Sequence, residues 1–276
     1  MSDSRQALKV AVQAARAGGR ILKRRMGGLR RSQFSRKGKY DWVTEVDKES
    51  ERAILKILRG RFPDHSVKAE ESAPTEAAQL RQWLIDPLDG TVNYMHRFPM
   101  FCVSIAFVER GKLEVGVVYD PIREELFTAR RGKGAFLNGR RIRVTDCSEF
   151  DRSLLATGFP FRAKSKMDLY LGSFRKVFLR TGSIRRAGSA ALDLAYVACG
   201  RMDGFWEMAL QPWDMAAGAL LIQEAGGRVT DFFGRPEFLE QGHVLAGNRP
   251  LHRRLLRLLA PYFRGKMNEA RTCGME

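Results

Sequence analysis

The 276-residue sequence has few cysteines and no long apolar segment. Its four cysteines, Cys102, Cys147, Cys199 and Cys273, are far apart and form no C-x-x-C pair, which argues against a disulfide framework and a zinc knuckle. The longest apolar stretches span about eight residues, whereas a membrane helix needs about 20. The first residues also lack the apolar core and the cleavage site of a signal peptide. We therefore expect a cytoplasmic protein with no membrane span.

Acidic residues are scarce at the two ends of the chain. Residues 1–40 contain twelve lysines and arginines and one acid, and residues 249–276 contain seven and two. Almost all of the net charge of +17 therefore lies at the ends, and the region between them is nearly neutral. A basic segment is the electrostatic footprint of nucleic-acid binding, although the first segment holds few aromatic residues. Solvated basic faces are the more common explanation of such charge.

Hydropathy patterns predict helices near the N-terminus. Apolar residues recur every three to four positions over residues 8–26 and predict an amphipathic helix that ends near Gly27. A basic Gly/Ser loop is expected over residues 29–40. A second helix is predicted to begin near Thr44 and to end before Pro63.

The pattern then changes to short strands, followed by helices and further strands. The predicted strands cover residues 67–71, 83–86, 101–109, 113–120, 125–130, 153–157, 228–230 and 243–246. The later helices are predicted at residues 166–179, 188–199, 213–224 and 251–262. We therefore expect a mixed α/β fold with helix layers against sheets. Its two intimate halves would be residues 1–150 and 151–276, forming one compact catalytic unit.

The segment Asp86-Pro87-Leu88-Asp89-Gly90-Thr91 has the features of a metal site at the end of a strand. Proline stiffens the turn, and glycine permits a close approach that a side chain would block. Two carboxylates at positions i and i+3 repel one another unless a cation lies between them. Mg²⁺ typically takes one or two carboxylates together with substrate phosphate. An Asp-Pro turn with a capping carboxylate is the alternative, and these residues alone leave it open.

Two further acids stand at positions that fit the same site. Glu70 ends the strand before this segment, and Asp214 opens a helix rich in small residues. Each also has an ordinary explanation, since a strand end is often solvated and the helix dipole favours an acid in the first turn. The spacing excludes the D-x-D-x-T nucleophile motif, and no Gly-Lys is followed by Ser or Thr as in a Walker A loop.

Three segments, in order and with matching spacing, resemble signatures of the inositol monophosphatase family. They are WLIDPLDGTVNYMHRFPMFCVSIAF, AEES and WDMAAGALLIQEAGG. The segments VTEVD and GSAALDLAYVACGRMDGFWE and the first helix also match, so the resemblance covers about residues 5–263. It is closest to the bacterial inositol-1-monophosphatases. The resemblance implies a layered α-β-α-β-α sandwich of the sugar-phosphatase type and Mg²⁺-dependent hydrolysis of myo-inositol 1-phosphate and related phosphomonoesters.

The resemblance also implies metal ligands and catalytic residues. The implied Mg²⁺ ligands are Glu70, Asp86, Asp89, Asp214 and the main-chain carbonyl of Leu88. The nucleophile would be a water molecule oriented by Glu70 and the Thr91 hydroxyl, and Thr91 would hydrogen-bond to Asp47. Thr44-x-x-Asp47 is also close to a capping box at the start of the second helix. Both roles of this aspartate are compatible.

Substrate contacts are implied on both sides of the scissile bond. The implied substrate-binding residues are Gly90, Thr91, Gly188, Ser189, Ala190, Glu207 and Asp214. Glu207 follows an aromatic strand segment, and its carboxylate is a plausible acceptor for polyol hydroxyl groups. Lys37 matches a basic residue on a flap that reaches the phosphate, although Arg36 and Lys39 are close enough to leave that assignment open.

The resemblance further implies inhibition by lithium and a homodimer. The dimer contact would lie around residues 183–187 and the helix that follows. Two functions stay open on the sequence: a Mg²⁺-dependent inositol-1-monophosphatase, and a phosphatase-fold protein that binds nucleic acid or a transcription or ribonucleoprotein complex through its basic ends. Inositol 1-phosphate cannot be ranked against other small polyol and sugar phosphates.

Overall fold

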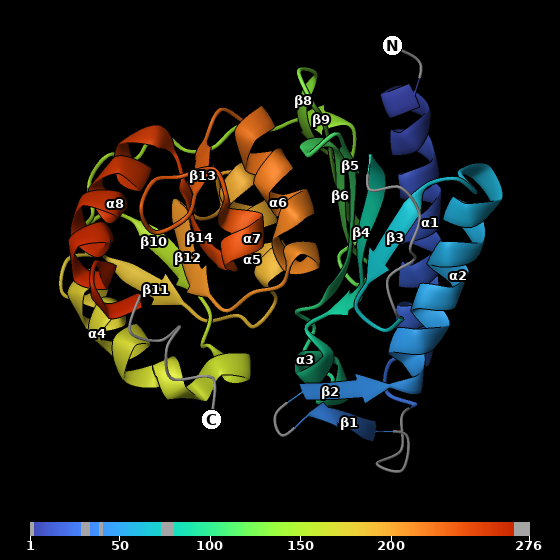
Figure 1. Ribbon diagram of the computed structural model, residues 1–276, viewed down its shortest axis with the longest axis horizontal. Coiled ribbons are helices and arrows are strands. Elements are labelled where there is room, and N and C mark those ends of the chain that lie inside the picture. The colour runs from blue at the N-terminus through green and yellow to red at the C-terminus, as the bar shows by residue number, and fades with distance from the viewer. Residues whose placement is uncertain (1–2, 29–33, 39–40, 73–79, 268–276) are drawn as a thin grey trace.

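The protein folds into five layers in the order α-β-α-β-α (Figure 1). The computed structural model describes residues 3–28, 34–38, 41–72 and 80–267. The outer layers are α1 (Asp3–Arg25) with α2 (Glu45–Arg61), and α4 (Met167–Phe178) with α8 (Arg249–Phe263). The central layer is α5 (Ala190–Ala198) with α6 (Pro212–Glu224). The layered α/β sandwich expected from the sequence is confirmed.

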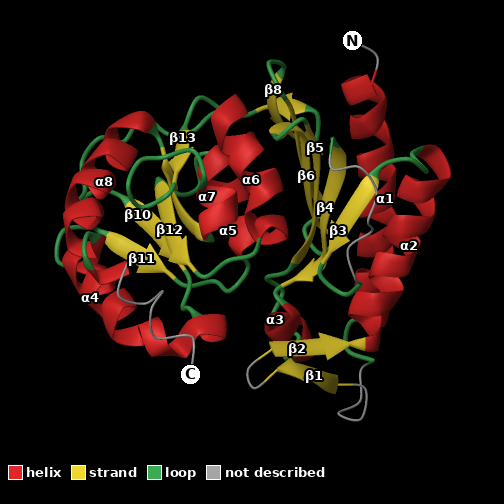
Figure 2. Ribbon diagram, in the orientation of Figure 1, coloured by secondary structure: helices red, strands yellow, loops and turns green. Residues whose placement is uncertain are grey.

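One sheet separates α1 and α2 from α6 (Figure 2). Its seven strands lie in sequence order, and the pairing of β3 with β4 is parallel while the other pairs are antiparallel. The strands are β3 (Ser66–Ala69), β4 (Arg81–Asp89), β5 (Cys102–Glu109), β6 (Lys112–Asp120), β7 (Glu125–Arg130), β8 (Gly134–Leu137) and β9 (Arg140–Arg141). The β4–β5 register shifts between Asp86 and Asp89, so the Pro87-Leu88 turn interrupts the regular ladder.

The other sheet lies between α5 and the outer helix α8. Its order is β11-β10-β12-β14-β13, with β10 parallel to both of its neighbours. The strands are β10 (Leu154–Thr157), β11 (Ser183–Arg185), β12 (Gly204–Met208), β13 (Arg228–Thr230) and β14 (His243–Gly247). The shorter helical elements are α3 (Thr91–Met95), a 3₁₀ segment (Phe161–Lys166) and α7 (Phe238–Gln241).

The loop expected over residues 29–40 is wrong for residues 34–38, which form β1 (Phe34–Gly38). This strand pairs antiparallel with β2 (Asp41–Thr44), from Phe34 opposite Thr44 to Gly38 opposite Asp41. The segment Ser35–Gly38 is polar and has no apolar alternation to mark it as a strand. Its extended conformation comes with pairing to β2. Residues 29–33 and 39–40 lie outside the described residues.

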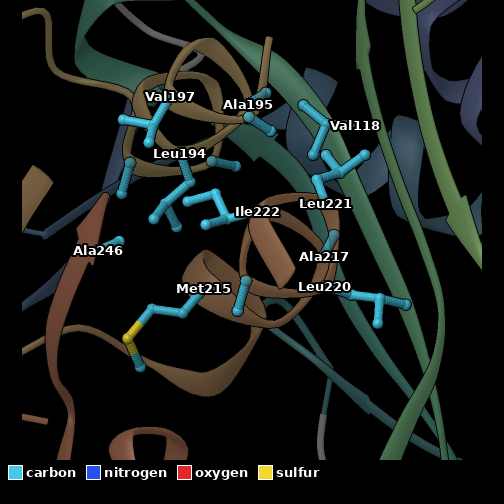
Figure 3. Close-up of a cluster of buried hydrophobic side chains, with 14 of the residues drawn as sticks. Val118, Leu194, Ala195, Val197, Met215, Ala217, Leu220, Leu221, Ile222 and Ala246 are labelled. Atoms are coloured by element: carbon cyan, nitrogen blue, oxygen red, sulfur yellow. The ribbon is translucent and has the colours of Figure 1, made fainter. Parts of the chain in front are cut away.

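Helix α6 lies buried between the seven-stranded sheet and α5 (Figure 3). Its apolar residues are spread around the helix, which is typical of a helix that is packed on more than one side. A Cβ on Gly116 of β6 would lie 2.8 Å from the carbonyl oxygen of Ala217, so the helix approaches the strand at backbone distance. On the other side of α6, Leu194 of α5 packs against Gly218. Small residues thus allow α6 to pack closely against both β6 and α5. Within the described residues, no helix has the length and apolar character that crossing a membrane requires.

Candidate functional site

A pocket of about 380 Å³ opens where the end of β4 meets the first turns of α5 and α6 and the end of β12. The predicted site residues that line it are Glu70, Asp86, Leu88, Asp89, Gly90, Thr91, Gly188, Ser189, Ala190, Glu207 and Asp214. Asp47 is fully buried behind Thr91. The fold therefore brings together residues from both halves of the chain.

The turn after Asp86 is rigid because its own side chain holds it. The backbone N–H of Leu88 donates to Oδ1 of Asp86 over 2.9 Å. Gly90 has a φ of 97°, which other residues rarely adopt, and a Cβ there would lie 2.8 Å from the carbonyl oxygen of Met100. The backbone therefore turns sharply and presents Asp86 and Asp89 to the same pocket.

Asp47 accepts three hydrogen bonds that tie α2 to the start of α3. The backbone N–H and the hydroxyl of Thr44 donate to its Oδ2 over 2.9 Å and 2.6 Å. The hydroxyl of Thr91 donates to its Oδ1 over 3.0 Å. Burial raises the pKa of Asp47 to about 6, although these hydrogen bonds act in the opposite direction. The predicted capping box and the predicted Thr91 contact are both confirmed.

Two other polar side chains of α2 hold neighbouring parts of the site, and neither was predicted from the sequence. Ser50 donates its hydroxyl hydrogen to the carbonyl oxygen of Pro87 over 2.9 Å. Glu51 accepts from the backbone N–H of Glu71 over 2.9 Å, beside the predicted ligand Glu70. Asp47, Ser50 and Glu51 fall on one helix face at spacings of three and four, so one face of α2 positions three segments.

Asp89 is held by the first turn of α5. The Ser189 hydroxyl and the Ala191 backbone N–H donate to its Oδ2 over 2.6 Å and 2.8 Å. Asp214 is likewise anchored in the first turn of α6, where its Oδ2 accepts from the backbone N–H of Gln211 over 2.8 Å. Each of these carboxylates therefore has one oxygen fixed by the protein. The Ser189 hydroxyl positions Asp89, and its predicted contact with substrate stays a prediction.

Four acids act on one another in the pocket. Burial raises the pKa of Asp86 well above its usual range, and the charges of Glu70, Asp89 and Asp214 raise it further. Among the described residues, no three Asp, Glu, His or Cys side chains converge closely enough to hold a metal ion as they stand. Three of these carboxylates are each turned toward a protein donor, so metal binding requires their side chains to rotate.

The donor set nevertheless fits a hard divalent cation. The residues that line this part of the pocket include four acids and Leu88, and carboxylate and backbone carbonyl oxygens are the ligands that such cations prefer. Repulsion among several buried carboxylates is relieved when a cation lies between them. Burial is the largest cause of the raised pKa of Asp86, and the charges of the neighbouring acids add to it.

Glu207 on β12 lines the same pocket. Its side chain is buried, and a Cβ on Gly158 would collide with its carboxylate. Burial raises the pKa of Glu207 well above its usual range, followed by the charges of Asp193 and Asp214, while Arg186 acts in the opposite direction. The predicted polyol residue therefore lies in the same pocket as the acids.

Several lining residues were not predicted from the sequence. Asn93 of α3 donates through Nδ2 to the carbonyl oxygens of Met100, Ala187 and Gly188 over 2.7, 2.9 and 3.2 Å. It lies within the recognised motif, and its amide joins the two halves. The remaining unpredicted lining residues include Trp42, Gly158, Phe159, Phe161, Lys164, Arg186 and Asp193. Lys37 lies on β1, and its side chain lies outside the described part of the structure.

Comparison with known proteins assigns nearly the whole chain to one protein family. Residues 3–267 match the model of the inositol monophosphatase family. Nus factor SuhB of Pseudomonas aeruginosa is 49% identical over 260 residues, which cover 92% of this chain and 96% of that protein.

Solved structures agree with this sequence match. The extragenic suppressor protein suhB from Bartonella henselae superposes with a TM-score of 0.89 at 44% identity, covering 92% of this chain and 98% of that one. The inositol monophosphatase from Anabaena superposes with a TM-score of 0.84 at 43% identity, covering 92% and 95%. The fold is therefore shared both with a relative named as a SuhB protein and with one named as an inositol monophosphatase.

Proposed function

Because the chain belongs to the inositol monophosphatase family, we propose that it is a Mg²⁺-dependent phosphomonoesterase that hydrolyses myo-inositol 1-phosphate and related small polyol phosphates. The observation that carries this proposal is the convergence of Glu70, Asp86, Asp89 and Asp214 on one pocket, which Glu207 also lines. The acids suit a metal–phosphate site, and Glu207 suits the alcohol.

Mg²⁺ would be held by the four carboxylates and the Leu88 carbonyl. When bound, it supplies Lewis-acid chemistry, lowering the pKa of water and neutralising charge on the phosphoryl group. The protein prepares for this by fixing Asp86 on Leu88 N–H, Asp89 on α5 and Asp214 on α6. Each anchor fixes one oxygen of its carboxylate, and a rotation of the side chain about that hydrogen bond is proposed to bring the other oxygen onto the ion.

Thr91 and Glu70 are proposed to orient the attacking water. The Thr91 hydroxyl hydrogen is directed to Oδ1 of Asp47, and the Leu88 carbonyl is a second acceptor at 3.2 Å. Its oxygen therefore acts as an acceptor toward the pocket, so a water molecule there donates one hydrogen to Thr91. Glu70 accepts the other proton as the water oxygen bonds to phosphorus. The bond between phosphorus and the ester oxygen breaks in the same step, and the alcohol oxygen leaves with its electron pair and takes a proton from solvent. Glu70 then returns its proton to solvent, so one water is consumed and the free alcohol and inorganic phosphate are released. Asp47 is a positioning residue, since it acts through Thr91.

The phosphate and the alcohol are proposed to bind opposite walls. The backbone N–H groups of Gly90 and Thr91 contact phosphate oxygens, and Glu207 accepts hydrogen bonds from ring hydroxyls. Gly188 and Ala190 form the floor of the alcohol side through their backbone. A wall that hydrogen-bonds hydroxyl groups discriminates against substrates that lack them.

A phosphate-release panel at fixed Mg²⁺ tests the proposal. The substrates are myo-inositol 1-phosphate, glycerol 2-phosphate, fructose 1,6-bisphosphate, a nucleoside 3′-phosphate, histidinol phosphate and p-nitrophenyl phosphate. The highest kcat/KM is expected for the inositol ester. The proposal is overturned if folded protein releases phosphate from none of them.

A second candidate function is contact with a transcription complex. Relatives at 49% identity carry the name Nus factor SuhB, and the basic ends provide a surface for an acidic partner. Helix α1 turns Ala11, Ala15 and Leu22 into the core and leaves a basic row exposed. That exposed row consists of Arg5, Lys9, Arg16 and Arg20.

This second function is tested by removing charge without removing the helix. Deleting residues 1–40 would strip α1 from the seven-stranded sheet, so charge-neutral substitutions are the cleaner test. The variant R5Q/K9Q/R16Q/R20Q is expected to leave an RNA column at lower salt than the wild type. The control R52Q/K56Q/R59Q/K112Q removes the same charge from exposed positions in the body. Equal shifts in both variants, or none, would contradict a specific role for α1.

A further inference from the structure

Asp193 lies in the pocket wall without a hydrogen-bond partner for one of its oxygens. Its side chain is 1% exposed, and its Oδ1 is the only carboxyl oxygen among the described residues that is buried and unpartnered. Other buried aspartates have donors: Asp203 accepts from Thr145 and Leu154, and Asp231 accepts from two backbone N–H groups. A buried polar group without a partner destabilises a fold, so an orphaned carboxyl needs another explanation.

The position of Asp193 in its helix gives no structural reason for the unpartnered oxygen. It is the single charged residue of α5, which is otherwise apolar and buried along its length. An acid in the first turn of a helix is favoured by the dipole, but the dipole supplies no hydrogen-bond donor to Oδ1 of Asp193. At 1% exposure the desolvation of the carboxyl opposes it, and burial raises the pKa of Asp193 well above its usual range.

Asp193 and Glu207 line the same pocket. After burial, the charge of Asp193 is the strongest influence on the pKa of Glu207. The charges that act on Asp193 itself are Asp89, which raises its pKa, and Arg186, which lowers it. Two carboxyl groups from different elements, α5 and β12, therefore lie close together at this pocket.

Resting on the proposed function, we propose that Asp193 is a second specificity-determining residue, whose side chain turns toward the bound alcohol and hydrogen-bonds a hydroxyl group next to the one that Glu207 binds. The two carboxyls would thus recognise two hydroxyl groups on adjacent carbon atoms. A hydroxyl is both donor and acceptor, so it pairs with Asp193 whether the carboxyl is charged or neutral. An alkyl or aryl group leaves Oδ1 unpartnered and is therefore selected against.

Two variants separate this role from a structural one. In Asp193→Leu an apolar side chain of similar size replaces the orphaned carboxyl, which removes the buried polar group and should raise or preserve the melting temperature. Asp193→Asn keeps an amide that can still hydrogen-bond a hydroxyl. Asp231→Asn is the control, because it alters an equally buried aspartate whose hydrogen bonds stay within its own loop.

The decisive readout is the ratio of kcat/KM for myo-inositol 1-phosphate to that for p-nitrophenyl phosphate. We expect D193L to lower this ratio by about 10–100-fold, the effect of losing one hydrogen bond to a charged group. D193N should recover at least half of the loss on a logarithmic scale, and D231N should leave the ratio unchanged. An unchanged ratio in folded D193L, or equal losses on both substrates, would overturn the proposal.

A second readout keeps the inference separate from catalysis. Saturation-transfer NMR with myo-inositol, and with cyclohexanol as the ring that lacks vicinal hydroxyls, reports polyol binding without turnover. The myo-inositol signal should be present in wild type, absent in D193L and retained in D193N. If wild type hydrolyses nothing but shows this pattern, the proposed function fails while Asp193 stands as a polyol-binding residue. If D193L binds myo-inositol as wild type does, Asp193 does not read hydroxyl groups.

Discussion

The Ser189 hydroxyl donates to Oδ2 of Asp89 over 2.6 Å, although the two residues are 100 positions apart in the chain. The same serine begins α5, and its oxygen accepts from the backbone N–H of Leu192 over 3.4 Å. One side chain therefore caps a helix of the second half and orients a predicted metal ligand of the first half. This hydrogen bond therefore joins the two halves of the chain and also holds the Asp89 carboxylate in place.

Replacing Ser189 by alanine should weaken metal use without changing substrate preference. Losing a hydrogen bond that orients a metal ligand typically lowers metal affinity or activity by about 10–100-fold. We expect the Mg²⁺ concentration for half-maximal activity to rise in S189A, with equal losses on inositol and aryl phosphates. Ser189→Thr keeps the hydroxyl and should recover most of the loss. Unchanged Mg²⁺ dependence in S189A would contradict a positioning role.

Asp47 should make stability depend on pH in the metal-free protein. Burial raises its pKa from 3.8 to about 6, so the folded state binds this proton more tightly than the unfolded chain. The stabilising effect of that proton is present below about pH 4 and is lost as pH rises through 6, by about 3 kcal/mol in total. Asn cannot titrate there, so the stability of D47N relative to wild type should rise over this interval.

Urea unfolding in EDTA between pH 4 and 7.5 measures this difference. Asp168 is exposed, and D168N should show no such change relative to wild type. A constant difference in unfolding free energy between D47N and wild type across the interval would show that Asp47 does not titrate as its burial predicts.

Glu207→Gln should impair the inositol substrate selectively. In the proposed function the four acids bind the metal and the phosphate, so selection of the alcohol is expected to come from Glu207. One hydrogen bond to a charged group contributes about 1.5–3 kcal/mol, which corresponds to roughly 10–100-fold in kcat/KM. The loss on p-nitrophenyl phosphate should be at least ten times smaller. The control is E224Q, since Glu224 binds backbone N–H groups of Gly132 and Gly134 away from the pocket.

We propose that the protein forms a homodimer in solution. Exposure in the structure indicates which residues of the predicted contact region are available for the interface. Helix α5 is buried along its length, so of the predicted region only β11 and its flanks face outward. β11 is an edge strand, and Phe178 and Leu179, 59% and 61% exposed, closely precede it. Light scattering at micromolar concentration should give twice the chain mass of 31.3 kDa. F178E/L179E should reduce it to the monomer, whereas Leu80→Glu, at a 63% exposed control site, should not.

Local signals in the sequence were sufficient for much of the fold. The capping box at Thr44 marked the start of α2, and the strands Glu125–Arg130 and Arg228–Thr230 lie where alternation and turn residues predicted them. β1 was missed because its residues are polar and its conformation accompanies pairing with β2. β11 was missed because three residues carry too short a pattern, and parallel pairing with β10 defines it.

The candidate site also contains some residues that local sequence predicts and others that only the tertiary structure reveals. Asp86 and Asp89 are three positions apart on one turn, so their proximity follows from local geometry. Asn93, Glu51 and Asp193 act on segments that only the tertiary fold brings near, and each has an ordinary local explanation as a helix residue. Residue type and spacing alone therefore could not distinguish them from surface or capping residues.

The central claim is that the clustered acids hold Mg²⁺ for hydrolysis of a phosphate ester, and metal removal followed by re-addition tests it most directly. Phosphate release from myo-inositol 1-phosphate is measured on EDTA-treated protein titrated with MgCl₂, alongside D89N and the exposed control D146N. We expect no turnover without Mg²⁺, recovery on titration for wild type and D146N, and none for D89N. Metal-free D89N should unfold at the same or higher urea concentration than wild type, because one repelling carboxylate is removed. Full turnover after EDTA treatment, or Mg²⁺-restored turnover in D89N equal to wild type, would contradict the account.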